Sequence, residues 1–503
     1  MGDGGEHGAK IIDREKFNKK RYMLVKDLQP KAVWEQFDAL TRVPRPSKKE
    51  ERVIEFLIEF AKRHNIEWQR DEIGNVVMRK PATAGYESRP TVILQSHMDM
   101  VCEKNSDVEF DFENDAIRAV VDGEWVRAEG TTLGADDGIG MAASMALLLD
   151  EEAEHGPLEM LFTVDEETGL TGAFNLGEGM LTGKYLINLD SEDEGEIFIG
   201  CAGGVDTVAT FACEKEAAPA DMNFYRVEVK DLVGGHSGDD INKGRANSNK
   251  LVARLMMLAQ EQFGARISHM DGGNLRNAIP REAYAVVGVP AAQGDAFVAL
   301  VDKFAADVKA EFAVTEPDMK LTVAVAETQS EVLTAELQQR LLSALVGLPN
   351  GVLAMSFAVP GLVETSTNLA SVKFVGDGIV VTTSQRSSVE SAKLYAKLSV
   401  ESVFTLAGAE VEHSDGYPGW APNPDSQLLA TTVESYERLF GVKPKVRAVH
   451  AGLECGLFLE KYPHLEMVSF GPTVLGVHSP DERINIATVE KFWLHLKDVL
   501  KSI

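Results

Sequence analysis

The sequence predicts an α/β protein whose mostly parallel mixed sheet, with helices on both faces, is interrupted by an inserted α+β domain. With 503 residues, the chain is too long for a single ordinary core. Strand-like and helix-like segments alternate near both of its ends. Longer alternating strands replace this pattern from residue 205 to about residue 414. We therefore expect a first domain formed by residues 1–204 and 415–503 and an inserted domain formed by residues 205–414.

The first domain is expected to begin after a polar N-terminal tail. Helices are expected where apolar residues recur at helical spacing, and strands where β-favouring residues run together or alternate. The expected helices are 31–41, 48–64, 139–150, 426–439 and 487–502, and the expected strands are 66–70, 75–79, one that begins at 91, 158–164, 185–189, 445–449 and 465–470. Functional sites of such sheets lie where the strands end.

The inserted domain is expected to combine longer strands with helices between them. Its alternating segments predict strands at 224–229, 283–289, 320–325 and 378–384, and its helical spacing predicts helices at 249–262, 296–311 and 389–406. The dipeptide Gly203-Gly204 is expected to break the pattern before it, and a linker-like stretch at 417–422 follows it.

Composition and charge limit the partners of this protein. The chain carries 78 acidic and 50 basic residues, a net charge of −28, which repels nucleic acid and anionic lipid. Its four cysteines form no CxxC pair, which indicates reduced thiols and a reducing compartment. The N-terminus resembles no secretion signal, and the longest apolar stretch, 139–149, is too short to cross a bilayer. We expect a cytoplasmic protein with no nucleic-acid or membrane partner.

A candidate metal ligand stands at the end of the strand that begins in TVILQSHMDMV. His97 and Asp99 follow its apolar residues, two positions apart. A histidine in that position suits a metal ion. The aspartate could bind the same ion, or it could hold the imidazole ring in the orientation that binds it. By itself, a strand-end histidine is at least as often only hydrogen-bonded.

Further carboxylates and a second histidine occupy similar positions. They are Asp136 and Asp137 in TTLGADDGIG, Glu166 and Glu167 after LEMLFTV, Asp190 after YLINL, and His478 in GPTVLGVHSPDER. A glutamate pair alone is usually a solvated acidic turn. Together, however, these residues offer nitrogen and oxygen ligands for two divalent ions about 3.5–4 Å apart, an arrangement suited to amide hydrolysis. Because adjacent side chains diverge, one glutamate can bind metal while the other acts as a general base.

Five motifs carry a resemblance that covers nearly the whole chain: SHMDMV, GADDGIGMA, DEETGLTGA, NLDSED and GVHSPDERI. Their order and spacing resemble those of the di-zinc metallopeptidases of the carnosinase, peptidase V and aminoacylase type. Within that family, they are similar to the bacterial aminoacyl-histidine (Xaa-His) dipeptidases, which are cytosolic hydrolases.

The resemblance implies a role for each polar residue. The implied ligands are His97 and Asp190 for one ion, Glu167 and His478 for the other, and Asp136 as a bridge between them; Asp99 would orient His97, and Glu166 would be the general base. It also implies a cis peptide bond between Asp136 and Asp137, and it favours Asp136 as the bridge. Zn²⁺ is the expected metal, while Co²⁺ and Mn²⁺ also suit the ligands.

The inserted domain resembles the lid of this family. The resemblance implies that His236 donates a hydrogen bond to the oxyanion and that Asn277 and Arg386 bind the substrate's carboxylate. Taken alone, these residue types would more often be structural or solvated. Residues 450–454 and 471–472 are expected to line the pocket, with His450 and Glu454 as further candidates. A homodimer through the lid and a monomer both remain open, so His236 could serve its own or a partner's site.

The function implied is hydrolysis of unblocked Xaa-His dipeptides by a hydroxide held between two metals, with Glu166 as the base. A related di-zinc aminoacylase, tripeptidase or carboxypeptidase specificity is the alternative, because metal ligands do not select substrates. A non-haem iron oxygenase using His97, Asp99 and His478 is a distant alternative that leaves the other carboxylates without a role. A metal-binding protein without catalytic activity is a further alternative, but it would give the proposed base and the lid residues no role.

Overall fold

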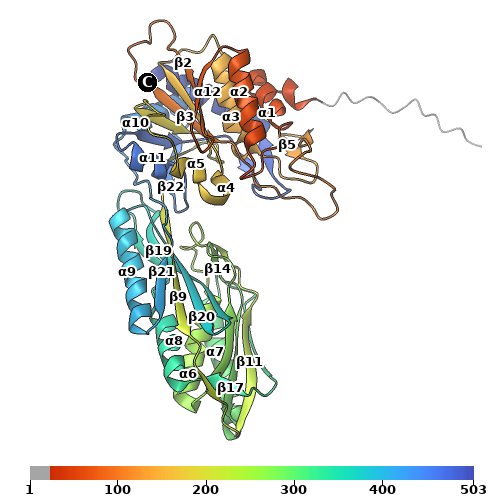
Figure 1. Ribbon diagram of the computed structural model, residues 1–503, viewed down its shortest axis with the longest axis vertical. Helices are drawn as coiled ribbons and strands as arrows, with labels where there is room; N and C mark the ends of the chain where they lie inside the picture. The colour runs from red at the N-terminus through yellow and green to blue at the C-terminus, as the bar shows by residue number, and fades with distance from the viewer. Residues whose placement is uncertain (1–22) are drawn as a thin grey trace, which may run out of the picture.

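The computed structural model describes residues 23–503, so the predicted N-terminal tail lies outside the described residues. Two bodies are visible in Figure 1, each built around its own sheet. The first body comprises residues 23–202 and 414–503, and the second comprises residues 203–413. In the part of the chain that the structure describes, no helix has the length and apolar character needed to cross a membrane.

The first body contains an eight-stranded mixed sheet. Across the sheet, the strands are β1 (Glu67–Arg70), β2 (Val76–Lys80), β6 (Leu158–Thr163), β3 (Val92–His97), β7 (Tyr185–Asn188), β23 (Glu466–Ser469), β8 (Glu196–Cys201) and β22 (Lys445–Val449). Strands β6, β3, β7 and β23 run parallel in the centre, whereas β1, β2 and β6 pair antiparallel, as do β23 and β8. This confirms the predicted fold class.

Helices cover both faces of this sheet because its central strands are apolar on both sides. On β3, Leu94 packs into one core while Ile93 packs into the core on the opposite face. The first core is formed with α1 (Lys31–Leu40), α2 (Glu51–Arg63), α3 (Ala135–Leu149), α10 (Gln427–Phe440) and α12 (Ile486–Ser502). The second is formed with α5 (Thr171–Phe174) and α11 (Cys455–Lys461).

A small four-stranded sheet lies beside the start of α3. Its order is β24 (Val474–Leu475), β25 (Arg483–Asn485), β5 (Trp125–Ala128) and β4 (Ala119–Asp122). The pairing of β25 with β5 brings the C-terminal part of the chain against the segment that leads into α3. Two residues inside α3, Asp136 and Asp137, have non-helical dihedral angles.

The second body is built on a nine-stranded antiparallel sheet. Its order is β16 (Lys320–Val325), β11 (Met222–Lys230), β15 (Ala283–Pro290), β13 (Arg266–Gly272), β19 (Val363–Val375), β20 (Gly378–Ser387), β9 (Gly203–Ala212) and β21 (Glu410–His413), and β18 (Gly351–Met355) pairs with β19. The helices α6 (Ser248–Phe263), α7 (Gly294–Glu311), α8 (Ala335–Gly347) and α9 (Glu390–Leu406) share a core with the sheet.

The remaining short elements are two-stranded pairs and single turns. They are β10 (Lys215–Ala217) with β17 (Glu331–Leu333), β12 (Gly235–His236) with β14 (Ala278–Ile279), the helix α4 (Glu166–Gly169), and the 3₁₀ turns η2 (Val25–Asp27) and η3 (Ala291–Gln293). Every helix and strand expected from the sequence is present: β16 and β22 have the expected bounds, and the others are shifted at one or both ends. Several elements were not expected, among them β8, β9, β13, β18, β19, α8 and α11.

Gly203 and Gly204 do not break the pattern as expected, because they lie inside β9 at the joint between the bodies. Isolated bridges pair Gly204 with Tyr417 and Cys201 with Trp420, so the stretch expected to be a linker is bonded to β8 and β9. A Cβ atom on Gly203 would lie 2.4 Å from the backbone nitrogen of Gly419. The glycine is therefore needed for two backbone segments to approach each other closely.

Replacing Gly203 by alanine should push these segments apart and lower the free energy of unfolding by about 1–3 kcal/mol, as overpacking does elsewhere. Thermal or urea denaturation measures the change. Gly347→Ala is the matched control, because a Cβ atom there meets no atom within 4 Å. Equal stability of the two variants would contradict this account of the joint.

Candidate metal centre and active site

The candidate site lies at the carboxyl edge of the first sheet, where three parallel neighbours end together. His97 is the last residue of β3, Glu166 and Glu167 open α4 shortly after β6, and Asp190 follows β7. Since β6, β3 and β7 are adjacent in the sheet, their ends lie side by side. The side chains are buried or half-buried there.

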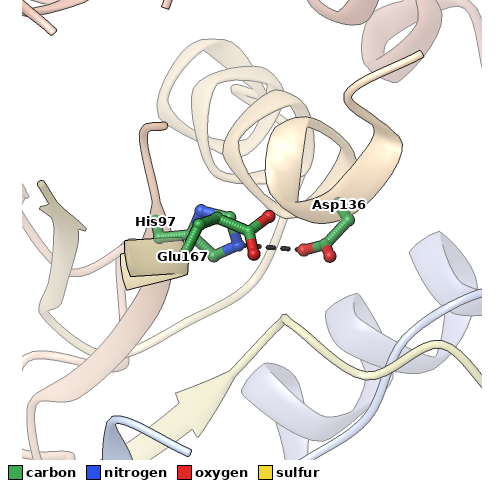
Figure 2. Close-up of side chains that lie close together, drawn as sticks. All are labelled: His97, Asp136 and Glu167. Carbon is green, nitrogen blue, oxygen red and sulfur yellow. Dashed lines mark hydrogen bonds and ion pairs between the residues drawn. The ribbon is translucent and has the colours of Figure 1, made fainter. Parts of the chain in front are cut away.

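Asp136 lies between the two histidines. Its Oδ1 is 2.9 Å from Nε2 of His97, and its Oδ2 is 3.2 Å from Nε2 of His478. Figure 2 shows Asp136 projecting from the start of α3 toward His97, with Glu167 beside them. Each oxygen of one carboxylate therefore faces a different imidazole. This is the arrangement that a carboxylate shared by two metal ions would have.

The other two predicted ligands complete this group. Nε2 of His478 is 3.0 Å from Oε2 of Glu167, and Nε2 of His97 is 3.5 Å from Oδ1 of Asp190. The structure thus places all five predicted ligands together. His478 reaches the group from a left-handed backbone position with a φ of 59°.

The two adjacent aspartates have different surroundings. The peptide bond between Asp136 and Asp137 is cis, as the resemblance implied. Asp137 is 1% exposed and accepts a hydrogen bond from the backbone N–H of Gly140, 3.1 Å away. Burial raises the pKa of Asp137 to about 8. Asp136, and not Asp137, therefore faces the histidines.

Asp99 connects His97 to the glutamate pair. Its Oδ1 lies 3.4 Å from Nδ1 of His97 and accepts the backbone N–H of Glu166 at 2.9 Å. Its Oδ2 accepts the backbone N–H of Glu167 at 3.2 Å and the hydroxyl of Ser47 at 2.8 Å. Nδ1 of His97 is also 3.1 Å from the backbone carbonyl oxygen of Asp99. A single buried residue thus lies against the imidazole and anchors the start of α4.

The electrostatics of the site reflect carboxylates that are buried close together. Burial raises the pKa of Asp190 and of Glu166 well above their usual values. Hydrogen bonds with Asp136 and Glu167 raise the pKa of His478 to about 11. Without metal, the carboxyl groups of Asp190 and Glu166 therefore tend to keep their protons, and bound cations would stabilise the ionised carboxylates instead.

These residues fit divalent metal ions. Ligand atoms of His97, Asp136 and Glu167 lie within 4.8 Å of one another. Oε1 of Glu167 is buried and has no hydrogen-bond partner among residues 23–503, so it is available as a ligand. Imidazole nitrogens combined with carboxylate oxygens suit Zn²⁺, Co²⁺ and Mn²⁺.

A cavity of about 450 Å³ opens beside this group and reaches the second body. The second body contributes His236, Asp239 and Asn277 to its lining. The residues that the first body contributes are Asp136, Glu166, Glu167, Asp190, Ser191, Glu192, Asp193, Phe198, Val449, Ala451, Gly452, Leu453 and His478. Of the segments expected to line the pocket, the central part of 450–454 does so, whereas residues 471–472 do not. One chain therefore supplies both sides of the cavity.

His236 is held in a form that can donate a hydrogen bond into this cavity. Its Nδ1 accepts the backbone N–H groups of Gly238 and Asp239 at 3.3 and 3.2 Å. Burial and the nearby Arg386 lower the pKa of His236, so the ring is neutral at pH 7. With Nδ1 acting as an acceptor, the proton resides on Nε2.

Arg386 lies in an adjoining cavity of about 240 Å³. Asn277 lines this cavity as well as the larger one, and Arg276 lies on its wall. Nη1 of Arg386 donates to the hydroxyl of Tyr417 at 2.8 Å. Its Nε is buried without a partner among the described residues. The guanidinium therefore has donors available for a ligand.

Comparison with known proteins identifies the family. Residues 93–501 match the model of peptidase family M20/M25/M40. The chain belongs to this family. It is therefore a peptide hydrolase, which confirms the resemblance carried by the five motifs and removes the oxygenase alternative.

Two relatives of this M20 peptidase are similar over nearly their full length. The cytosol non-specific dipeptidase of Escherichia coli (strain K12) is 42% identical over 95% of this chain and 98% of its own. The aminoacylhistidine dipeptidase of Vibrio alginolyticus is 43% identical over the same shares, and its crystal structure superposes with a TM-score of 0.89. A tripeptidase of Staphylococcus aureus, 16% identical over 94% of this chain and 98% of its own, shares the fold with a TM-score of 0.55.

A row of buried polar side chains lies beneath the proposed metal ligands of the peptidase, and of this row only Glu454 was a candidate from the sequence. Gln95 on β3 donates to Glu454 at 2.6 Å, and Thr163 on β6 donates to the same carboxylate at 2.8 Å. Asn188 on β7 donates to Gln95 at 2.6 Å. Gln95 and Asn188 stand two residues before His97 and Asp190 in otherwise apolar strands. A polar residue two positions before a proposed ligand, in a strand that is otherwise mostly apolar, was the sequence signal that could have revealed this row.

Replacing Asp99 by asparagine should lower kcat by ~10–100-fold, the usual effect of losing a group that orients a metal ligand. The amide nitrogen would face a backbone N–H or the Ser47 hydroxyl in place of an acceptor. Steady-state kinetics on metal-loaded protein test this. Ser47→Ala removes one of the three donors while leaving the carboxylate, so it should change kcat much less. An Asp99→Asn enzyme with unchanged kcat would refute this role.

Proposed function

We propose that this M20 peptidase is a metal-dependent dipeptidase that hydrolyses unblocked dipeptides with a C-terminal histidine. Two observations support the substrate class: the relatives are described as a non-specific dipeptidase and an aminoacylhistidine dipeptidase. The observation that carries the chemistry is Asp136, whose two oxygens face His97 and His478 separately. Glu166 lines the same cavity.

Two divalent ions are assigned to this group, with Zn²⁺ as the first choice. His97 and Asp190 would hold one ion, Glu167 and His478 the other, and Asp136 both. When bound, such ions polarise a peptide carbonyl and make a water molecule more acidic. The short distances from Asp136 and Glu167 to the imidazoles support this division of ligands.

The proton transfers are assigned to Glu166. Its backbone is fixed by Asp99, and its side chain faces the cavity next to Asp136 and Asp190. Glu166 takes a proton from the attacking water and delivers it to the leaving amine. The Nε2 proton of His236 would be donated to the carbonyl oxygen, where negative charge develops in the transition state.

The substrate's terminal carboxylate is assigned to Asn277 and Arg386. Asn277 lies on the boundary between the two adjoining cavities, and Arg386 presents its guanidinium in the smaller one. A carboxylate bound there would lie in a cavity that adjoins the one lined by the proposed metal ligands. This arrangement favours substrates with one residue after the scissile bond.

The location and assembly are part of this proposal. The E. coli relative is named as a cytosol enzyme, and the described cysteines are free thiols, which agrees with a cytoplasmic location. A homodimer through the second body would follow the family resemblance. Because His236 and the metal ligands of the same chain line one cavity, catalysis would not require a partner's histidine.

Adjacent glutamates provide a matched test of the catalytic assignment. Glu166→Ala should lower turnover of carnosine or Leu-His by ~10²–10⁴-fold, the usual contribution of a general base, while both ions stay bound. Glu167→Ala should instead lose bound metal. Elemental analysis and kinetics on the same samples distinguish them. Normal turnover by Glu166→Ala would eliminate it as the base.

A substrate panel tests the specificity. Carnosine and Leu-His should be cleaved in preference to N-acyl amino acids, tripeptides and dipeptides with an amidated C-terminus. Arg386→Ala should raise KM for free dipeptides by ~10–100-fold, since hydrogen bonds to charged groups contribute about 1.5–3 kcal/mol. Arg276→Ala is the control, because Arg276 is paired with Asp206 at 3.2 Å. Preference for acylated or longer substrates would instead indicate aminoacylase or tripeptidase specificity.

A further inference from the structure

Glu482 makes an unusual set of contacts four residues after His478. Its carboxylate is 2% exposed and accepts four consecutive backbone N–H groups. Oε2 accepts those of Leu133 and Gly134 at 2.7 and 3.0 Å. Oε1 accepts those of Ala135 and Asp136 at 2.7 and 3.3 Å. This carboxylate therefore holds the segment 133–136, which ends at the shared carboxylate of Asp136.

Arg45 holds the same segment through its carbonyl groups. Its side chain is 3% exposed, and Nη2 donates to the carbonyl oxygen of Gly134. Nη1 donates to the carbonyl oxygens of Met98 and Asp99 at 2.9 and 2.7 Å. The guanidinium thus joins the segment 133–136 to the chain that directly follows His97.

The two side chains together connect three segments that carry metal ligands. Glu482 belongs to the loop of His478, and β25, which begins at the next residue, pairs with β5. Arg45 reaches the end of β3, where His97 lies. None of these contacts involves a metal-binding atom. They fix backbone positions, so their effect on the ions would be exerted through the ligands.

We propose that Glu482, assisted by Arg45, is a positioning residue that sets the place of Asp136 between His97 and His478 and so raises the affinity for the shared metal ions. The inference rests on the metal site of the proposed function. Four charge-assisted hydrogen bonds to one carboxylate strongly restrict a short segment. Without them, the carboxylate of Asp136 would sample positions in which it cannot serve both ions.

Zn²⁺ binding by Glu482→Gln tests this proposal. The amide nitrogen of glutamine would face two N–H donors, so one pair of hydrogen bonds would be lost. Zn²⁺ affinity and stoichiometry are measured on metal-stripped full-length protein by competition with a chromogenic chelator. We expect the affinity for at least one ion to fall ~10–100-fold. Raising the Zn²⁺ concentration should restore part of the lost kcat, which it would not do for a purely structural defect.

Glu159→Gln is the matched control. Glu159 is also 2% exposed and accepts the backbone N–H groups of Thr182 and Gly183, but it lies near the opposite end of β6. This variant should be less heat-stable and should bind Zn²⁺ as the unchanged protein does. If Glu482→Gln does not fold, Glu482→Asp takes its place, because its shorter carboxylate cannot reach both pairs of N–H groups.

The outcomes separate the inference from the function on which it rests. Weaker Zn²⁺ binding by the Glu482 variant but not by Glu159→Gln supports the proposal. Unchanged Zn²⁺ affinity in the Glu482 variant, or an equal loss in Glu159→Gln, overturns it while leaving the metal site in place. If the protein without substitutions binds no Zn²⁺, Co²⁺ or Mn²⁺, the proposed function is overturned, and this inference is overturned with it.

Discussion

The dominant constraint on this structure is the burial of several carboxylates in one place. Asp136, Glu166, Glu167 and Asp190 converge at the carboxyl edge of one sheet, with His97 and His478 as the adjacent imidazoles. Like charges this close destabilise one another unless positive charge is supplied. The pKa values of Asp190 and Glu166 are raised mainly by burial and further by this repulsion. Bound cations would remove it, so metal binding and the stability of the site are physically linked.

The rest of the first body keeps these groups in place. Parallel neighbours β6, β3 and β7 bring the three strand ends with proposed ligands together. The buried side chains of Thr163, Gln95 and Asn188 connect these strands by hydrogen bonds. Asp99 fixes the start of α4. The second body adds His236 and Asn277 from the far side of the cavity. Rigidity is thus concentrated where charge is buried, and the proposed substrate-binding groups are supplied across the cavity.

The sequence located the elements and the polar residues that converge at the candidate site better than it located the side chains that support them. Apolar runs ending in polar residues located the strand ends, and the family motifs selected Asp136 over Asp137. The side chains that support the site could not be predicted, because they bind backbone groups. Glu482, for example, follows His478 in a polar loop, and the sequence gives no indication that it accepts four backbone N–H groups. Gly203-Gly204 looked like a break because local preference cannot reveal that the chain near Gly419 packs against it.

The central claim is that Asp136 is shared by two metal ions. A crystal structure of the Zn²⁺-loaded protein with anomalous diffraction data at the zinc edge tests it most directly. The account predicts two anomalous peaks, one contacted by His97 and Asp190 and the other by Glu167 and His478, with an oxygen of Asp136 on each. A single peak, or two peaks bridged by Asp137 or by no carboxylate of this pair, would contradict it.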